Sequence, residues 1–122
     1  MRYDFAVIGL GRVGSTLLEL LVQAGHSPAW VVTSKSAAAD VRSFPGIPED
    51  PGDARVVFLA VPDSVIRETA GLMASRWKDA CRGRVFFHLS GLHTSDILSD
   101  LERFGAETGS LHPLQSIMDR KL

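Results

Sequence analysis

A glycine-rich sequence near the start of the chain constrains the fold more than any other feature. Residues 3–8 form a short apolar run typical of a buried strand, and G-L-G-R-V-G follows directly at positions 9–14. In this pattern Gly9 permits a tight turn, Gly11 lets a pyrophosphate approach the backbone, and Gly14 lets a helix pack close to the strand. The helix N-terminus adds free N–H groups and partial positive charge. The motif therefore predicts a dinucleotide site; the alternative is a tight strand–helix turn that binds nothing.

Strand-like and helix-like segments alternate along the rest of the chain. Apolar runs predict further strands at 29–33, 56–61, 84–89 and 106–111. Most of the segments between these strands have apolar residues at helical spacing. Three prolines within residues 45–51 leave room only for a third strand around Ile47 that is short or absent, after a short helix at about 37–43. This alternation is typical of an α/β fold with a doubly wound parallel sheet, with the expected strand order 3-2-1-4-5-6.

Length and composition limit the class of protein. The 122 residues are enough for one domain, and we expect a single dinucleotide-binding domain over residues 1–122. Thirteen basic and fourteen acidic residues leave a net charge of −1, so no broad basic field is expected to bind nucleic acid or a membrane surface. One cysteine, Cys81, excludes an internal disulfide and a cysteine metal cluster. With no signal peptide and no long apolar run, we expect a cytoplasmic protein.

The choice of dinucleotide depends on the residues after the second strand. A site selective for NAD usually has an acidic residue about 20 positions past the glycines, but here Thr33-Ser34-Lys35-Ser36 occupies that place. A carboxylate would repel a 2′-phosphate, whereas hydroxyl groups and an ammonium group attract it. We therefore expect NADP, with NAD as the alternative.

Four motifs in order resemble a known family. They are G-L-G-R-V-G at 9–14, A-V-P-D at 60–63, H-L-S-G at 88–91 and G-S-L-H-P-L-Q at 109–115. Together they resemble the N-terminal domain of Rossmann-like oxidoreductases of the DUF2520 type, which are related to pyrroline-5-carboxylate reductase, F420-dependent NADP reductase and 6-phosphogluconate dehydrogenase-like proteins. The resemblance implies a Rossmann NAD(P)-binding fold, an NADP-type cofactor and hydride transfer to or from a small carbonyl, imine or hydroxy substrate.

The resemblance also implies that a helical C-terminal domain for substrate binding and dimerisation is absent from this chain. We therefore expect the chain alone to lack activity, and the alternative function is a dinucleotide-sensing or interaction module without catalysis. An apolar patch near Leu114, Ile117 and Met118 could promote a homodimer.

The candidate site residues lie in the loops beyond the carboxyl ends of the strands. For catalysis we expect His112, which could polarise a carbonyl or imine, and Ser90, for which a turn-forming role is the alternative. No metal site is expected, because no pair of histidines has helical ligand spacing. The residues expected to contact the dinucleotide are Gly9, Leu10, Gly11, Arg12, Val13, Gly14, Thr33, Ser34, Lys35, Ser36, Ala60, Val61, Pro62, Ser90 and Gly91.

Overall fold

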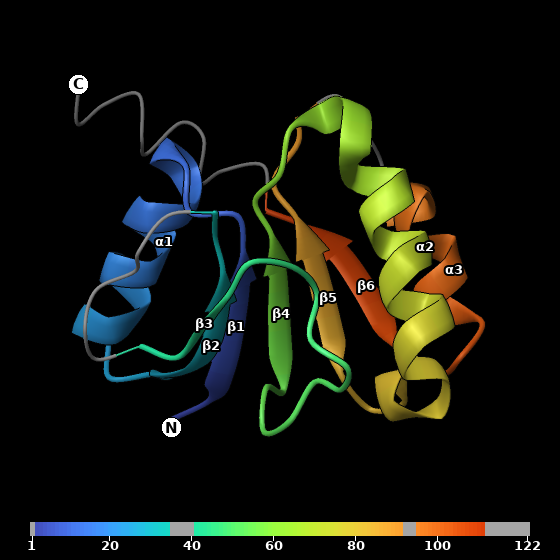
Figure 1. Ribbon diagram of the computed structural model, residues 1–122, viewed down its shortest axis with the longest axis horizontal. Coiled ribbons are helices and arrows are strands. Elements are labelled where there is room, and N and C mark those ends of the chain that lie inside the picture. Colours follow the sequence, from blue (N-terminus) through green and yellow to red (C-terminus); the bar gives the residue numbers. More distant parts are fainter. Residues whose placement is uncertain (1, 35–40, 92–94, 112–122) are drawn as a thin grey trace.

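A parallel sheet forms the centre of the molecule (Figure 1). The computed structural model describes residues 2–34, 41–91 and 95–111. Within them the sheet has six strands in the order β3-β2-β1-β4-β5-β6, with every pair parallel. This confirms the predicted α/β fold class and strand order. The strands are β1 (Asp4–Ile8), β2 (Ser27–Val32), β3 (Ser43–Phe44), β4 (Val56–Leu59), β5 (Val85–His88) and β6 (Glu107–Ser110).

Helices lie on both sides of this sheet, with α1 on one side and α2 and α3 on the other (Figure 1). Helix α2 follows a short 3-10 turn that begins at Asp63, and no side-chain hydrogen bond caps that turn or α2. Backbone turns make this connection instead. The helical elements are α1 (Arg12–Gln23), η1 (Asp63–Val65), α2 (Ile66–Trp77), η2 (Lys78–Cys81), η3 (Ser95–Leu98) and α3 (Ser99–Glu102).

The two faces of the sheet bury alternate residues of each strand, because successive side chains of a strand point to opposite faces. On β1, Phe5 and Val7 pack with Leu17 of α1, whereas Ala6 and Ile8 belong to the cluster that includes α2. Both clusters consist of nearly inaccessible side chains. The central strand is therefore covered on both faces, as a parallel sheet requires.

The third strand is short, as predicted, but its predicted position is wrong. It consists of Ser43–Phe44 rather than residues around Ile47, and the N–H groups of Val31 and Thr33 donate to the carbonyls of Arg42 and Phe44 at 2.9 Å. Pairing with the edge of β2 selects these residues although they carry no apolar pattern. The helix predicted at 37–43 is not present over residues 41–43, and residues 37–40 lie outside the described part of the chain.

An irregular segment replaces the usual helix between β3 and β4. We call residues 45–52 the strap. Four side chains hold it by donating to its carbonyls: Trp30 to Pro51 at 2.9 Å, Trp77 to Pro48 at 2.8 Å, Arg84 to Gly52 at 2.9 Å, and Arg76 to Ile47. A row of aromatic rings lies beneath it and joins Phe44, Trp30, Trp77 and Phe86 at centroid distances of 5.9 to 6.3 Å. The strap thus closes one face of the sheet without regular structure.

Candidate functional site

The turn between β1 and α1 is fixed by two glycines that leave no space for a side chain. Gly9 has a φ of +97°, and a Cβ there would lie 2.5 Å from the carbonyl oxygen of Ala60. A Cβ on Gly14 would lie 1.9 Å from the carbonyl oxygen of Gly9. Real Cβ atoms do not approach oxygens so closely, so any larger residue would force the helix away from the strand. The tight turn and close packing that the sequence predicts are therefore present.

Gly11 differs from these two glycines because it faces open space. A Cβ at this position would meet no heavy atom within 4 Å, and Gly11 is exposed at the N-cap of α1. No side chain caps this helix end, and its first turn carries no acidic residue. The first N–H groups of an α-helix have no partner within the helix. This end of α1 therefore offers backbone donors and the positive end of the helix dipole to an anion.

The carboxyl ends of β1, β2 and β4 meet at this point. The N–H of Gly9 donates to the carbonyl of Val32 at 2.9 Å, and the N–H of Ala60 donates to the carbonyl of Ile8 at 2.8 Å. β1 pairs with β2 on one side and with β4 on the other. The order in which successive strands are added to the sheet therefore reverses between β1 and β4. Ligands of open parallel sheets bind in the crevice at such a switch point.

Two hollows open at this edge of the sheet. The first, the β2-side hollow, has a volume of about 350 Å³ and reaches Thr33 and Ser34. The second, the β5-side hollow, has a volume of about 340 Å³ and reaches Asp63 and Leu89. Both hollows share Gly11, Ala60, Val61 and Pro62. They therefore lie on either side of one ridge, formed by the glycine loop and the end of β4.

The lining accounts for most of the predicted contact residues that the structure describes. Among the described residues, the β2-side lining includes no charged side chain, whereas the β5-side lining includes Arg12 and Asp63. Sequence reasoning did not include Leu89 as a contact, although its place at the end of the predicted strand at 84–89 was the available signal. Gly9, Leu10, Thr33 and Ser34 line the β2-side hollow, Arg12 and Val13 the β5-side hollow, and Gly14 is buried in the helix contact.

The remaining predicted residues lie apart from this lining. Ser90 is only 5% exposed and its N–H donates to Nδ1 of the fully buried His88 at 3.2 Å, so its backbone belongs to the core at the end of β5. Gly91 is exposed beside it, and neither residue lines the two hollows. Lys35, Ser36 and His112 lie outside the described residues, as do Leu114, Ile117 and Met118.

Metal and membrane sites receive no support from the described residues. Within residues 2–34, 41–91 and 95–111, no group of three or more His, Cys, Asp or Glu side chains is arranged to hold a metal ion. In the same ranges, no helix combines the length and apolar character needed to cross a bilayer.

Comparison with solved structures finds proteins that share this fold. A protein from Bacteroides fragilis, provisionally named an NADP oxidoreductase, is 13% identical with a TM-score of 0.68, over 89% of this chain and 42% of its own. An imine reductase from Bacillus cereus is 20% identical with a TM-score of 0.64, over 90% of this chain and 40% of its own. A conserved hypothetical protein from Pyrococcus furiosus is 19% identical with a TM-score of 0.65, over 95% of this chain and 99% of its own.

These likenesses show the fold, and the chain spans about two fifths of the first two structures. A search of curated proteins gives no match. The model of the Rossmann-like domain matches residues 1–113, which is nearly the whole chain. The chain therefore belongs to the Rossmann-like domain family.

Proposed function

We propose that this chain is the NADP(H)-binding domain of an oxidoreductase that transfers hydride to or from a small carbonyl, imine or hydroxy substrate. The observation that carries the proposal is the pair of hollows on either side of the ridge at Gly11 and Pro62. A dinucleotide has two nucleoside halves joined by a pyrophosphate, and the ridge offers the pyrophosphate open backbone at a helix N-terminus. The names of the neighbours, an NADP oxidoreductase and an imine reductase, support the reaction class.

The residues of the site suit the group that we propose. Backbone N–H groups at the start of α1 would hold the pyrophosphate, with Arg12 adding positive charge nearby. The adenosine half would occupy the β2-side hollow, and the nicotinamide half the β5-side hollow. The nicotinamide supplies the hydride chemistry when it is bound. The chain's own contribution is to bind and orient it, while Ala60, Val61 and Pro62 allow close approach because their exposed atoms are small or apolar.

The preference for NADP over NAD rests on the end of β2. Among its described lining residues, the β2-side hollow has no carboxylate that would repel a 2′-phosphate, and Ser34 is exposed there. Lys35 and Ser36 follow Ser34 in the sequence and lie outside the described residues. A Lys35→Asp substitution should shift the preference toward NADH, because the new carboxylate would repel the 2′-phosphate and accept from ribose hydroxyls. Equal loss of affinity for NADPH and NADH would contradict this interpretation.

The decisive experiment is a titration of the purified chain with NADPH and with NADH, followed by cofactor fluorescence. We expect saturable binding below millimolar concentration, with tighter binding of NADPH. Gly11→Ala should weaken binding by about tenfold or more, because its methyl group would occupy the place of the pyrophosphate. Gly46→Ala is the matched control, since its Cβ also meets no atom within 4 Å and it lies in the strap. Absence of binding of either dinucleotide would overturn the proposal.

Catalytic roles for Ser90 and His112 are part of the proposal, and their test needs a protein that catalyses the hydride transfer. Ser90 is nearly buried, so it could act in catalysis or shape the turn after β5. The Ser90→Ala substitution distinguishes these two roles. Loss of turnover with an unchanged Kd for NADPH would support catalysis, whereas lower stability with normal turnover would support a turn-forming role. For His112→Asn, we expect slower turnover with little change in cofactor affinity.

A further inference from the structure

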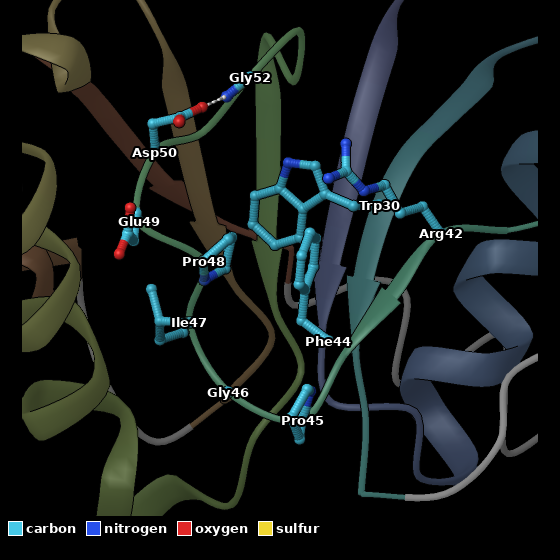
Figure 2. A pocket seen from close by; sticks show the side chains of 10 residues that line it. All are labelled: Trp30, Arg42, Phe44, Pro45, Gly46, Ile47, Pro48, Glu49, Asp50 and Gly52. Carbon is cyan, nitrogen blue, oxygen red and sulfur yellow. Dashed lines mark hydrogen bonds between the residues drawn. The ribbon is translucent and has the colours of Figure 1, made fainter.

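A larger pocket lies away from the glycine loop, between the strap and the edge of the sheet (Figure 2). Its volume is about 510 Å³, and it shares no lining residue with the two hollows at the carboxyl edge. Figure 2 shows the strap curving around it, with the rings of Trp30 and Phe44 at its centre. The four side-chain hydrogen bonds described above hold the strap, so the chain's own contacts fix this wall. Preformed pockets lose less free energy to ordering on binding.

Apolar side chains form most of the lining. Trp30 and Phe44 meet edge to face, with ring centroids 6.3 Å apart and an angle of 78° between their planes. Trp30 is almost fully buried, whereas Phe44, Ile47 and Pro48 are half-buried, so part of each remains exposed at the pocket. Aromatic rings favour contact with further flat or apolar groups. The pocket therefore suits a ligand with an apolar or aromatic body.

Most hydrogen-bond acceptors of the strap are already engaged or directed elsewhere. The four strap carbonyls that accept from side chains are occupied, as described above. Oδ1 of Asp50 accepts from the N–H of Gly52 at 2.9 Å. Glu49 is exposed, and Figure 2 shows its carboxylate on the side of the strap away from the aromatic rings. A ligand lying on the rings therefore finds few acceptors for N–H or O–H groups of its own.

A donor, in contrast, is available beside the rings. Among the described lining residues, Arg42 alone carries a positive charge, and its Cζ lies 5.1 Å from the centre of the Phe44 ring. This arrangement holds the guanidinium over an aromatic face. Within the part of the chain that the structure describes, the guanidinium makes no hydrogen bond or ion pair, so its N–H donors are available. A guanidinium presents paired donors that match the two oxygens of a carboxylate.

From this arrangement we propose that the strap pocket binds a monocarboxylate with an apolar or aromatic body. The carboxylate accepts from the guanidinium of Arg42, and the body lies against Phe44 and Pro48. An ionised carboxylate only accepts hydrogen bonds, which matches a pocket whose available polar group is a donor. Glu49 and Asp50 also belong to the lining and repel a second negative charge, so a dianion binds more weakly. The proposal is independent of the dinucleotide site, because no lining residue is shared.

Isothermal titration calorimetry with three compounds of similar body tests the proposal. 3-Phenylpropanoate carries one carboxylate, 3-phenylpropanamide has no charge, and phenylsuccinate carries a second carboxylate. We expect saturable binding of 3-phenylpropanoate, and we expect the amide to bind more weakly by about tenfold or more, since it loses the charged pair with Arg42. Phenylsuccinate should also bind more weakly than 3-phenylpropanoate. Failure of 3-phenylpropanoate to bind, or an amide or dicarboxylate that binds as tightly, would overturn the proposal.

A substitution at an exposed position identifies the cation. Arg42→Gln should remove the advantage of 3-phenylpropanoate over the amide, because both compounds then meet a neutral side chain. Arg42 is exposed and holds no other described residue by a hydrogen bond, so the variant should keep the fold. Arg67→Gln on the exposed side of α2 is the matched control and should leave all three affinities unchanged. Unchanged selectivity in Arg42→Gln would contradict the assignment.

Nitrogen-15 NMR spectra of the same titration show where the carboxylate binds. The chain has two tryptophans, and of these Trp30 belongs to the described lining of the pocket. We expect the indole N–H signal of Trp30 to shift more than that of Trp77. Shifts that are largest at the amides of Gly9 and Gly11 would indicate binding at the dinucleotide site and would overturn the proposal. Titration with NADPH keeps this result separate from the proposed function, because dinucleotide binding can succeed or fail without it.

Discussion

The glycine loop leads from β1 into α1 and the strap leads from β3 to β4, but opposite means fix their shapes. The loop at residues 9–14 is defined by missing side chains: Gly9 and Gly14 allow backbone atoms to meet where a Cβ would collide. The strap at residues 45–52 is defined by side chains that reach it from elsewhere. Its carbonyls accept from Trp30, Trp77, Arg76 and Arg84, which lie 21 to 32 residues away in the sequence.

This difference separates two kinds of pocket. The loop exposes backbone donors and little side-chain chemistry, which suits a phosphate group that any sequence with the right glycines can hold. The strap surrounds a pocket with rings and charged groups, so the identity of its side chains determines what it accepts. The comparison predicts that substitutions in the loop act through backbone collision, while substitutions at the strap act through lost hydrogen bonds and packing.

The largest expected effect is at Gly14. Gly14→Ala places a methyl group 1.9 Å from the carbonyl oxygen of Gly9, which cannot move without displacing β1 or α1. We expect the free energy of unfolding to fall by about 3 kcal/mol or more, at the upper end of the cost of overpacking. Urea denaturation followed by circular dichroism measures the change.

Gly11→Ala is the control for this prediction, because it adds the same methyl group in the same loop without a collision. Its cost should stay within about 1 kcal/mol, the usual range for alanine at an N-cap. If both variants were equally unstable, glycine flexibility rather than steric contact would govern the loop, and the comparison would fail.

The elements around the loop were predictable because their signals are local. The apolar runs of β1, β4 and β5 and the six-residue glycine motif lie within short windows, and burial on both faces of a parallel sheet produces such runs directly. The position of β3 was not predictable in this way. Ser43 and Phe44 form a strand because β2 offers an edge, and only the folded sheet brings that edge to them.

The candidate sites show the same division. Gly9, Gly11, Ala60 and Pro62 were predictable as lining residues because the motif and the strand ends place them at one edge of the sheet. Nothing in the sequence near Arg42 or Glu49 indicates that they line one pocket, since the position of the strap depends on two distant indoles. The buried position of Ser90 likewise depends on its packing at the end of β5.

The second largest effect is expected at Trp77, which sharpens the role of the strap. Trp77→Phe removes the donor to Pro48 and part of a buried ring that packs on Trp30 and Phe86. We expect a loss of about 2–3 kcal/mol from the hydrogen bond and the packing together. Hydrogen exchange should show faster opening at the amide of Ala54, which donates to Pro51 at the end of the strap.

Phe58→Leu provides the control, because Phe58 packs on the opposite face of the sheet. It should lower global stability while leaving the protection of Ala54, relative to that of the other slow amides, unchanged. If the amide of Ala54 exchanged equally fast in the two variants, relative to the other slow amides, Trp77 would not stabilise the strap beyond its effect on the whole fold.

A smaller effect is expected at Cys81, which is fully buried and belongs to the same core cluster as Trp77. Burial raises the pKa of its thiol, and the charge of Arg84 opposes this in part. The unfolded chain therefore loses the thiol proton at lower pH than the folded chain. Stability from this group is complete below the unfolded pKa and falls as pH rises through the window up to the folded pKa.

Cys81→Ala tests this dependence, because the difference in unfolding free energy between the two proteins should change only in that alkaline window. Cys81→Ser should cost about 1–2 kcal/mol at neutral pH, since it buries a hydroxyl group in place of a weakly polar thiol. A pH-independent difference between the original protein and Cys81→Ala would refute the stated effect of burial on the thiol pKa.

The smallest effect is expected at Arg76, and it tests whether exposed donors also hold the strap. Arg76→Met keeps most of the apolar stem but removes the guanidinium that donates to Ile47. We expect a loss of about 0.5–1 kcal/mol, the net value of one hydrogen bond partly open to water. Arg67→Met on the exposed side of the same helix should change stability by less than this. If the two variants agree within error in urea denaturation, the hydrogen bond from Arg76 to Ile47 does not help to hold the strap.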